Sequence, residues 1–142
     1  MTETEDTSVK LNFPFVGIPS FMRSQICTDL DQLDADIAVF GIPHDEGSPF
    51  LAGSRMGPRA IREHSLRFGA RGPGGEKSIY DPETRTQYLA EELGQGLIAD
   101  VGDVDVWPTE VRTTFKNATD LTRKILAKGA FPVMLGGDHG VT

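Results

Sequence analysis

The sequence has little of what several classes of protein require. Its 142 residues include a single cysteine, Cys27, so an intrachain disulfide is excluded. A lone thiol is more often a packing residue than a reactive one, and we expect Cys27 to pack. No apolar run approaches the roughly 20 residues that span a bilayer. Neither G-x-G-x-x-G nor G-x-x-x-x-G-K-[ST] occurs in the sequence, so its glycines do not follow a nucleotide-binding pattern.

Positive charge is scarce as well. The chain has 14 Lys and Arg against 21 Asp and Glu, a formal charge of −7 and a pI near 4.9. Nucleic acid and anionic membrane surfaces attract basic proteins, so both are disfavoured as partners. The first ten residues, MTETEDTSVK, are polar and acidic, unlike a signal or transit peptide. Together with the single cysteine, they predict a cytoplasmic protein.

Length and composition favour one globular domain, with 38% hydrophobic and 25% charged residues. Residues 1–30 are predicted to be an N-terminal arm, partly disordered. Within it, LNFPFVGIPSF (11–21) is apolar but too broken by proline and glycine for a helix. We expect it to be covered by the domain or by a neighbouring subunit. Residues 31–142 are assigned to one α/β domain.

Strand and helix patterns alternate along this domain. The continuous apolar core of ADIAVFGIP (35–43) predicts a strand buried on both faces. After a loop over 44–55, a helix is predicted over 57–68, starting at Pro58. Its expected inner face carries Ala60, Ile61 and Leu66, and its expected outer face carries Arg59, Arg62 and Glu63.

A hairpin around a DPET turn is predicted over 78–89, and a second core strand over 97–106. The stretch 110–129 predicts a long helix that is capped by Thr109 and terminated by Gly129. Its apolar stripe comprises Val111, Phe115, Ala118, Leu121 and Ile125. A third core strand follows over 131–137. This alternation predicts right-handed crossovers and a doubly wound α/β sheet.

In such sheets, function collects beyond the carboxyl ends of the strands. The acidic and histidine residues expected there are His44, Asp45, Glu46, Asp103, Asp105, Asp138 and His139. Carboxylates and imidazoles together suit a divalent metal. Aspartates in such loops also cap helices and close turns, so both interpretations stay open. In GGDHG, two glycines after a buried strand allow a positive φ or a close backbone approach, which would present His139 at a definite angle.

Three stretches resemble motifs of the ureohydrolase (arginase–agmatinase) family. LGGDHGVT resembles the first metal-ligand motif of that family, usually GGDHS. GIPHDEGSPFLAGSRMGPRAIREHS is similar to the agmatinase-type segment G-[IV]-P-x-D-x-G…G-[AST]-R-x-G-P-x-x-I-R. DVGDVDV looks like the D-x-G-D-[IV] strand that precedes a long helix. The resemblance covers residues 13–142 and is closer to agmatinase and guanidinobutyrase types than to arginase.

The resemblance implies a three-layer α/β/α fold with a mostly parallel sheet and two divalent metal ions, manganese or in some members nickel. These ions would bridge a hydroxide that attacks a guanidinium carbon, releasing urea and an amine. His139 matches the histidine ligand of the family, whereas Asp138 is not a direct ligand there and is expected either to support a ligand by hydrogen bonding or to fix the loop. The family pattern supplies no metal role for Asp103 or Asp105, which favours capping. His44 would face the substrate entrance or be structural, and His64 would be a surface or packing residue.

The sequence departs from the family pattern in two ways. Gly140 stands where serine is usual, so a hydroxyl beside the metal is missing. The later motifs D-A-H-x-D and S-x-D-x-D-x-x-D-P do not occur, which leaves one metal ligand of six and no assigned catalytic or substrate-binding residue.

We therefore expect the N-terminal part of a longer ureohydrolase that is inactive by itself, with an open sheet edge and exposed apolar faces. It would associate as a homotrimer or homohexamer, or with a complementary chain, and act on a small guanidino compound. The alternatives are a non-catalytic partner or scaffold of the same fold and an α/β small-molecule binding domain.

Overall fold

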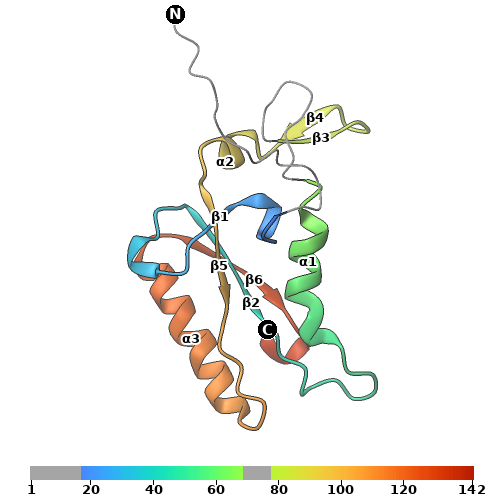
Figure 1. The fold of residues 1–142 in the computed structure, drawn as a ribbon, viewed down its shortest axis with the longest axis vertical. Helices are drawn as coiled ribbons and strands as arrows, with labels where there is room; N and C mark the ends of the chain where they lie inside the picture. The colour runs from blue at the N-terminus through green and yellow to red at the C-terminus, as the bar shows by residue number, and fades with distance from the viewer. Residues whose placement is uncertain (1–16, 69–77) are drawn as a thin grey trace, which may run out of the picture.

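The computed structural model describes residues 17–68 and 78–142. Its centre is a four-stranded sheet in the order β1-β5-β2-β6, in which every pairing is parallel. The strands are β1 (Gln25–Ile26), β2 (Ile37–Ile42), β5 (Ile98–Asp103) and β6 (Phe131–Gly136). From the central β2 the chain continues to β5 on one side, and from β5 it crosses to β6 on the other side. This is the doubly wound arrangement that the sequence predicts (Figure 1).

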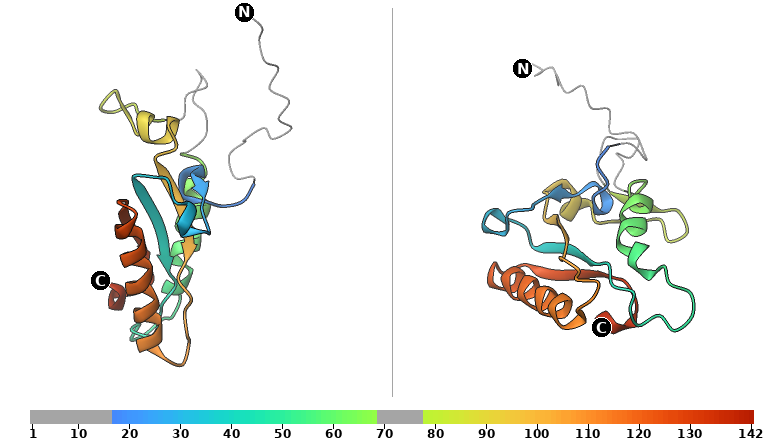
Figure 2. Two further views of the ribbon diagram at one scale, coloured as in Figure 1. Left: turned by 90° about the vertical axis from the view of Figure 1, so that its left-hand side faces the viewer. Right: turned by 60° about the horizontal axis from the view of Figure 1, so that its bottom comes forward.

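Helices cover both faces of this sheet. Figure 2 shows α3 (Val111–Ala127) on one side and α1 (Gly57–Ser65) with residues 17–26 on the other. Because side chains alternate along a strand, Phe40 and Ile42 enter the α3-side core, whereas Val39 enters the opposite core. Cys27 is buried in the α3-side core, where its thiol donates to the carbonyl of Asp29 at 3.2 Å, as expected of a packing residue. The predicted three-layer α/β/α fold is confirmed.

The smaller elements lie at one end of the sheet. β3 (Ile79–Asp81) and β4 (Thr86–Tyr88) form the predicted hairpin, and a short helix that the sequence pattern missed, α2 (Ala90–Gly94), follows it. The hairpin lies at the opposite end of the molecule from the loop over 45–55 (Figure 1). Most of the apolar segment 11–21 lies outside the described residues, although Ile18 is exposed. β1 falls within the predicted arm and pairs with β5.

The ends of α3 show which local signals were informative. Gly129 has φ +81°, and the amide of Ala130 reaches back to the carbonyl of Ile125 at 3.3 Å, so the helix ends in the glycine-terminated form expected. The predicted Thr109 cap is wrong, because the N-cap residue is Glu110 and no side chain caps the helix. Thr114, absent from the predicted stripe, is fully buried and accepts from the amide of Trp107 at 2.9 Å.

The inner face of α1 also differs from its prediction. Leu66, just past the helix, is buried as expected, but Ala60 is exposed and Ile61 is 41% exposed. The buried positions within the helix are Pro58, Arg62 and Ser65. Arg62, predicted to face solvent, is only 7% exposed because two carboxylates of β5, Asp100 in the middle of the strand and Asp103 at its end, bind it.

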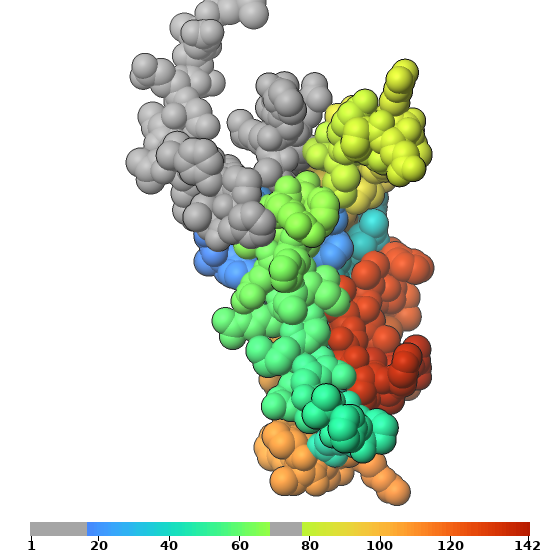
Figure 3. All heavy atoms as spheres, turned by 90° about the vertical axis from the view of Figure 1, so that its right-hand side faces the viewer, coloured from blue at the N-terminus to red at the C-terminus, as the bar shows by residue number. Residues whose placement is uncertain are grey.

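One edge of the sheet is open in the part of the chain that the structure describes. β6 pairs with β2 over all six residues, and no described strand pairs with its other side. Phe131 donates its amide to the carbonyl of Asp36 at 2.7 Å, toward β2. The backbone nitrogen of the next residue, Pro132, therefore faces the open side of β6, where the missing N–H of proline costs no hydrogen bond. Phe131 itself is 68% exposed, and Met134 is exposed as well. In Figure 3, α1 and β6 adjoin on the face of the molecule that includes this edge.

Among the described residues, no helix combines the length and the apolar character needed to cross a membrane.

Candidate functional site

The GGDHG turn lies at the carboxyl end of β6. β6 ends at Gly136, and a single 3₁₀ turn spans His139–Val141. Asp138 is the N-cap residue of this turn, and its carboxylate accepts the amide of Gly140 at 2.7 Å. His139 is exposed. Its imidazole is therefore presented outward from a fixed turn, as a metal ligand would need to be, and its role as a ligand stays a prediction.

Glycine precedes Asp138 because two backbone segments approach each other closely there, and not because a positive φ is needed. Neither Gly136 nor Gly137 has a positive φ. A Cβ at Gly137 would lie 1.8 Å from the carbonyl oxygen of His44, and a Cβ at Gly57 would lie 2.8 Å from that of Gly136. The turn therefore packs directly on the chain after β2 and on the start of α1, and side chains would separate these backbones.

Asp138 connects the turn to the loop after β2. One oxygen of its carboxylate accepts the amide of Gly47 at 2.6 Å, and the other accepts the amide of Gly140. Its own amide donates to the carbonyl of His44 at 3.0 Å. The loop-fixing role expected of Asp138 is thus present in the structure.

His44 lies in the interior and not at a surface entrance. It is only 3% exposed, and its ring meets Phe115 of α3 edge-on with centroids 5.1 Å apart. Among the described residues, its Nδ1 atom has no hydrogen-bond partner. Of the remaining histidines, His64 is exposed on α1, which agrees with a surface role.

Asp45 organises the long loop that follows β2. Its carboxylate accepts the hydroxyl of Ser48 at 2.6 Å, the amide of Gly53 at 2.5 Å and the Nη1 of Arg55 at 2.9 Å. The Ser48 hydrogen bond is the largest cause that lowers the pKa of Asp45 to about 2; burial opposes the shift, and the backbone amides of the loop support it. Asp45 is therefore a carboxylate whose acceptor positions are taken up by its own loop.

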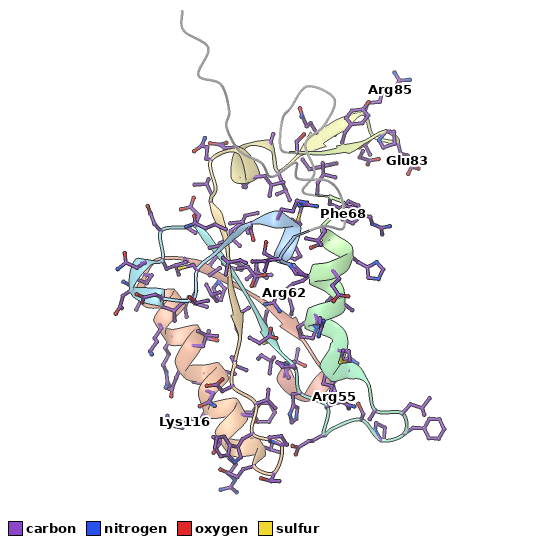
Figure 4. The ribbon with its side chains drawn as sticks, in the orientation of Figure 1. Arg55, Arg62, Phe68, Glu83, Arg85 and Lys116 are labelled. Atoms are coloured by element: carbon purple, nitrogen blue, oxygen red, sulfur yellow. The ribbon has the colours of Figure 1, made fainter. Side chains whose placement is uncertain are left out.

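A buried charge network connects α1 to β5. Arg62 donates from Nε and Nη2 to the two oxygens of Asp100 at 2.7 and 3.0 Å, and from Nη1 to Asp103 at 2.6 Å. Burial works against the charge on the guanidinium, but the hydrogen bonds to Asp100 and Asp103 raise the pKa of Arg62 above its usual range. Figure 4 shows Arg62 extending from α1 toward the sheet.

This network corrects the capping role predicted for Asp103. Its carboxylate is an ion-pair partner, and it lies so close to β2 that a Cβ at Gly41 would be 2.0 Å from its Oδ1. The sequence did contain a signal for this network: two aspartates, Asp100 and Asp103, lie on one strand, and an arginine lies on the preceding helix. The amphipathic pattern of that helix, however, predicted that Arg62 faces solvent. Asp105 caps no helix either, since α3 has no side-chain cap.

The acids predicted to gather around a metal do not form a complete site. Among residues 17–68 and 78–142, no group of three His, Cys, Asp or Glu side chains could hold a metal ion. Asp45, Asp103 and Asp138 each bind a cation or backbone amides of the fold instead. The described residues offer His139 as one candidate ligand but not a coordination set.

His139 opens onto a pocket of about 460 Å³. One wall is the loop after β2, and the rest is the end of β6 and the turn that follows it. The lining residues are Gly47, Ser48, Pro49, Ser54, Met134 and residues 136–142. Histidine, backbone groups and hydroxyls thus share one concave surface at the carboxyl end of the sheet, where α/β proteins bind their ligands.

Comparison with known proteins identifies the family of this fold. The sequence model of the arginase family matches residues 35–142. The chain belongs to the arginase family. Relatives in this family include the mitochondrial guanidino acid hydrolase of Homo sapiens, 35% identical over 127 residues, and the agmatinase of Chromobacterium violaceum, 35% identical over 128 residues. These matches cover 89% and 90% of this chain but 32% and 35% of the relatives.

Solved arginase-family structures agree with the fold. Proclavaminate amidino hydrolase from Streptomyces clavuligerus matches with a TM-score of 0.67 and 26% identity, covering 90% of this chain and 38% of that one. A hypothetical agmatinase from Burkholderia thailandensis matches with a TM-score of 0.70 and 27% identity, covering 91% and 36%. A formiminoglutamase from Trypanosoma cruzi, described with Mn²⁺, matches with a TM-score of 0.57 and 26% identity, covering 76% and 33%. The chain spans about a third of the length of these relatives.

Proposed function

We propose that this chain is the N-terminal part of a ureohydrolase that hydrolyses a small guanidino compound, such as agmatine or guanidinobutyrate, to urea and an amine. Relatives named agmatinase, guanidinopropionase and guanidino acid hydrolase, each at least 30% identical over about 90% of the chain, support this activity class. The observation that carries the proposal is the exposed His139 at the carboxyl end of β6, within a pocket of ligand-binding size.

The metal requirement is part of the same proposal. A guanidinium carbon is a poor electrophile, so the attacking water must be activated, and a pair of divalent ions would supply hydroxide at neutral pH. Manganese is the metal proposed first, with nickel second, because the solved formiminoglutamase is described with Mn²⁺. His139 would provide one imidazole ligand, and the other ligands would come from residues outside this chain.

A second role is favoured by one specific observation. The described residues contain no set of three metal-ligating side chains. With one candidate metal ligand and no complete metal site among the described residues, the chain would act as a non-catalytic partner or scaffold of the same fold. In either role we propose association, as a homotrimer or homohexamer or with a complementary chain. The open edge of β6 would be covered by the rest of the fold, in the same polypeptide or in a complementary one.

The experiment is urea release by the complete gene product, loaded with Mn²⁺ or Ni²⁺, from agmatine, 4-guanidinobutyrate, arginine and free guanidine. The proposal expects urea from at least one guanidino compound and none from the 142-residue chain by itself. If the complete product binds neither metal and releases no urea, the enzyme proposal is wrong and the scaffold role remains.

A further inference from the structure

We propose that a cavity at the amino-terminal end of the sheet binds a small zwitterion, an α-amino acid with a short aliphatic side chain. The cavity has a volume of about 240 Å³ and lies between residues 22–25, α2 and the start of β5. His139 follows the carboxyl end of β6, whereas Gln25 and Ile98 begin their strands, and the strands of this sheet are parallel. The cavity is therefore at the opposite end of the sheet from the candidate metal ligand, and the inference does not depend on the proposed ureohydrolase function.

A turn with an unusual backbone forms one wall of this cavity. The carbonyl of Phe21 accepts the amide of Ser24 at 2.9 Å, and the two residues between them, Met22 and Arg23, have φ +51° and +58°. Turns with positive φ at both central positions favour Gly, Asn and Asp, because other side chains are strained there. Residues held in such strained conformations are found preferentially at functional sites, including sites that hold ligands.

The fold holds this turn in place. Three hydrogen bonds connect it to β5 and to the end of α1. They run from the amide of Phe21 to Asp100 at 2.8 Å, from the amide of Met22 to the hydroxyl of Ser65 at 2.8 Å, and from Nε of Arg23 to the carbonyl of Leu66 at 3.1 Å. The wall is thus in position before a ligand arrives, which lowers the entropic cost of binding.

The apolar part of the cavity is built from three core residues. Met22, Leu93 and Ile98 line it, are 6%, 5% and 4% exposed, and belong to one hydrophobic cluster. Their side chains give an aliphatic group a surface to pack on. Drug-sized ligands occupy pockets of about 300–1,000 Å³, so this smaller cavity suits a molecule with few non-hydrogen atoms.

The charged residues of the cavity are one carboxylate and one guanidinium. Glu92 is half-buried, and its carboxylate takes part in no hydrogen bond or ion pair within residues 17–68 and 78–142. Arg23 is half-buried as well. An arginine has five N–H donors, so Arg23 can hold the carbonyl of Leu66 and also bind a carboxylate. One charge of each sign favours a ligand that carries both signs over a simple cation or anion.

An aliphatic α-amino acid combines the three features that the cavity requires. Its ammonium group would bind Glu92, and its carboxylate would bind Arg23. Its side chain would pack on the apolar residues of the cavity. Leucine has these groups in a molecule of suitable size, and we therefore choose it as the probe.

The test uses the complete gene product with ¹³C-labelled methyl groups in isoleucine and methionine, and follows their NMR signals during titration with L-leucine. The methyl signals of Met22 and Ile98 report on the cavity, and that of Met134, which lines the pocket beside His139, reports on binding there. Isoamylamine, which lacks the carboxylate, and 4-methylpentanoate, which lacks the ammonium group, are titrated in the same way. The variant is Glu92→Gln, and Glu91→Gln, an exposed position on the same helix, is the matched control.

L-Leucine is expected to shift the signals of Met22 and Ile98 saturably and to leave that of Met134 unchanged. Loss of one charged contact weakens binding about tenfold, so Glu92→Gln and each of the two analogues should raise Kd by about that factor. Glu91→Gln should bind leucine as the wild type does.

Three results would overturn the inference. The first is the absence of a saturable shift of Met22 and Ile98 at millimolar leucine, and the second is a Kd for leucine that Glu92→Gln leaves unchanged. The third is an analogue with a single charge that binds as tightly as leucine, because the cavity would then not select a zwitterion. Since binding is measured without urea release, the outcome is independent of whether the proposed function holds.

Discussion

Arg62 on α1 holds both carboxylate oxygens of Asp100 on β5, at 2.7 and 3.0 Å, in a region from which water is almost excluded. Two parallel N–H···O bonds fix both the direction and the distance of the pair. The pair connects the helix that precedes the hairpin to the strand that follows it. Since the amide of Phe21 also donates to Asp100, at 2.8 Å, one carboxylate joins three separate segments of the chain.

Replacing Arg62 by methionine should be strongly destabilising. The change would leave Asp100 buried without a counter-charge, and breaking a buried pair costs about 3–5 kcal/mol. Urea-induced unfolding of the chain measures this cost directly. Arg59→Met is the matched control, because Arg59 is exposed and, within residues 17–68 and 78–142, its ion pair is with Glu63 on the helix surface, a pair worth about 0.5 kcal/mol. Equal losses for the two variants would contradict the account of the network.

Gly137→Ala tests the close approach of the turn to His44. A methyl group at this position would overlap the carbonyl oxygen of His44, and since both sides of the contact are backbone, neither can rotate away. We expect a loss of about 3 kcal/mol or more in the free energy of unfolding. Gly94→Ala in α2, where a Cβ meets nothing within 4 Å, should be neutral or slightly stabilising. A Gly137→Ala variant as stable as Gly94→Ala would show that the turn is not packed as described.

The pH dependence of loop 45–55 follows from the pKa of Asp45. The folded value, about 2, lies below the ordinary 3.8, so the stabilisation from this clamp is fully present above about pH 3.8 and is lost as pH falls through about 2. Ser48→Ala removes the largest cause and should raise the pKa of Asp45 toward its ordinary value. The carboxyl ¹³C shift of Asp45, followed by NMR from pH 1.5 to 5, measures both. An unchanged titration in Ser48→Ala would disprove the assigned cause.

The open edge of β6 predicts self-association of the 142-residue chain. Strand edges with exposed apolar side chains pair with other chains, and a charge on the edge prevents this. Met134→Lys should therefore lower the fraction of oligomer in sedimentation experiments over a range of concentrations. Tyr80→Lys, an exposed residue of the β3–β4 hairpin and outside the four-stranded sheet, serves as the control. If both variants associate as the wild type does, the β6 edge is not the contact.

The layers and the order of elements could be predicted because their signals are local. The unbroken apolar run Ile37–Ile42 identified a strand covered on both faces, and Gly129 and Pro58 marked helix ends through their own backbone preferences. These properties depend on neighbours in the sequence. They do not depend on tertiary contacts with distant parts of the chain.

The errors arose where a distant residue decides the outcome. Arg62 faces inward because Asp100 and Asp103 lie opposite it, about 40 positions later in the sequence. Ile61 is exposed because the inner face of α1 follows Arg62 and not the apolar residues. Likewise, the capping predicted for Asp103 failed because no local pattern reveals an ion pair between a helix and a strand.

The candidate site could be predicted only as a location. The GGDHG motif placed His139 correctly at the end of a strand, and the expected loop-fixing role of Asp138 is present in its bonds to Gly47 and Gly140. The clamp formed by Asp45 was missed, since aspartate in a turn-rich loop has many roles. Nothing in the sequence indicated that the ring of His44 would be buried against Phe115.

Variants of the complete gene product can decide whether His139 is a metal ligand of a ureohydrolase. Metal content and urea release of the complete gene product are compared for the wild type, His139→Ala and His64→Ala, the last being an exposed histidine on α1. We expect His139→Ala to lose bound Mn²⁺ and at least about tenfold in urea release, because replacing even a residue that supports a metal ligand costs about 10-fold to 100-fold. His64→Ala should match the wild type. Unchanged metal content in His139→Ala would show that His139 is not a metal ligand.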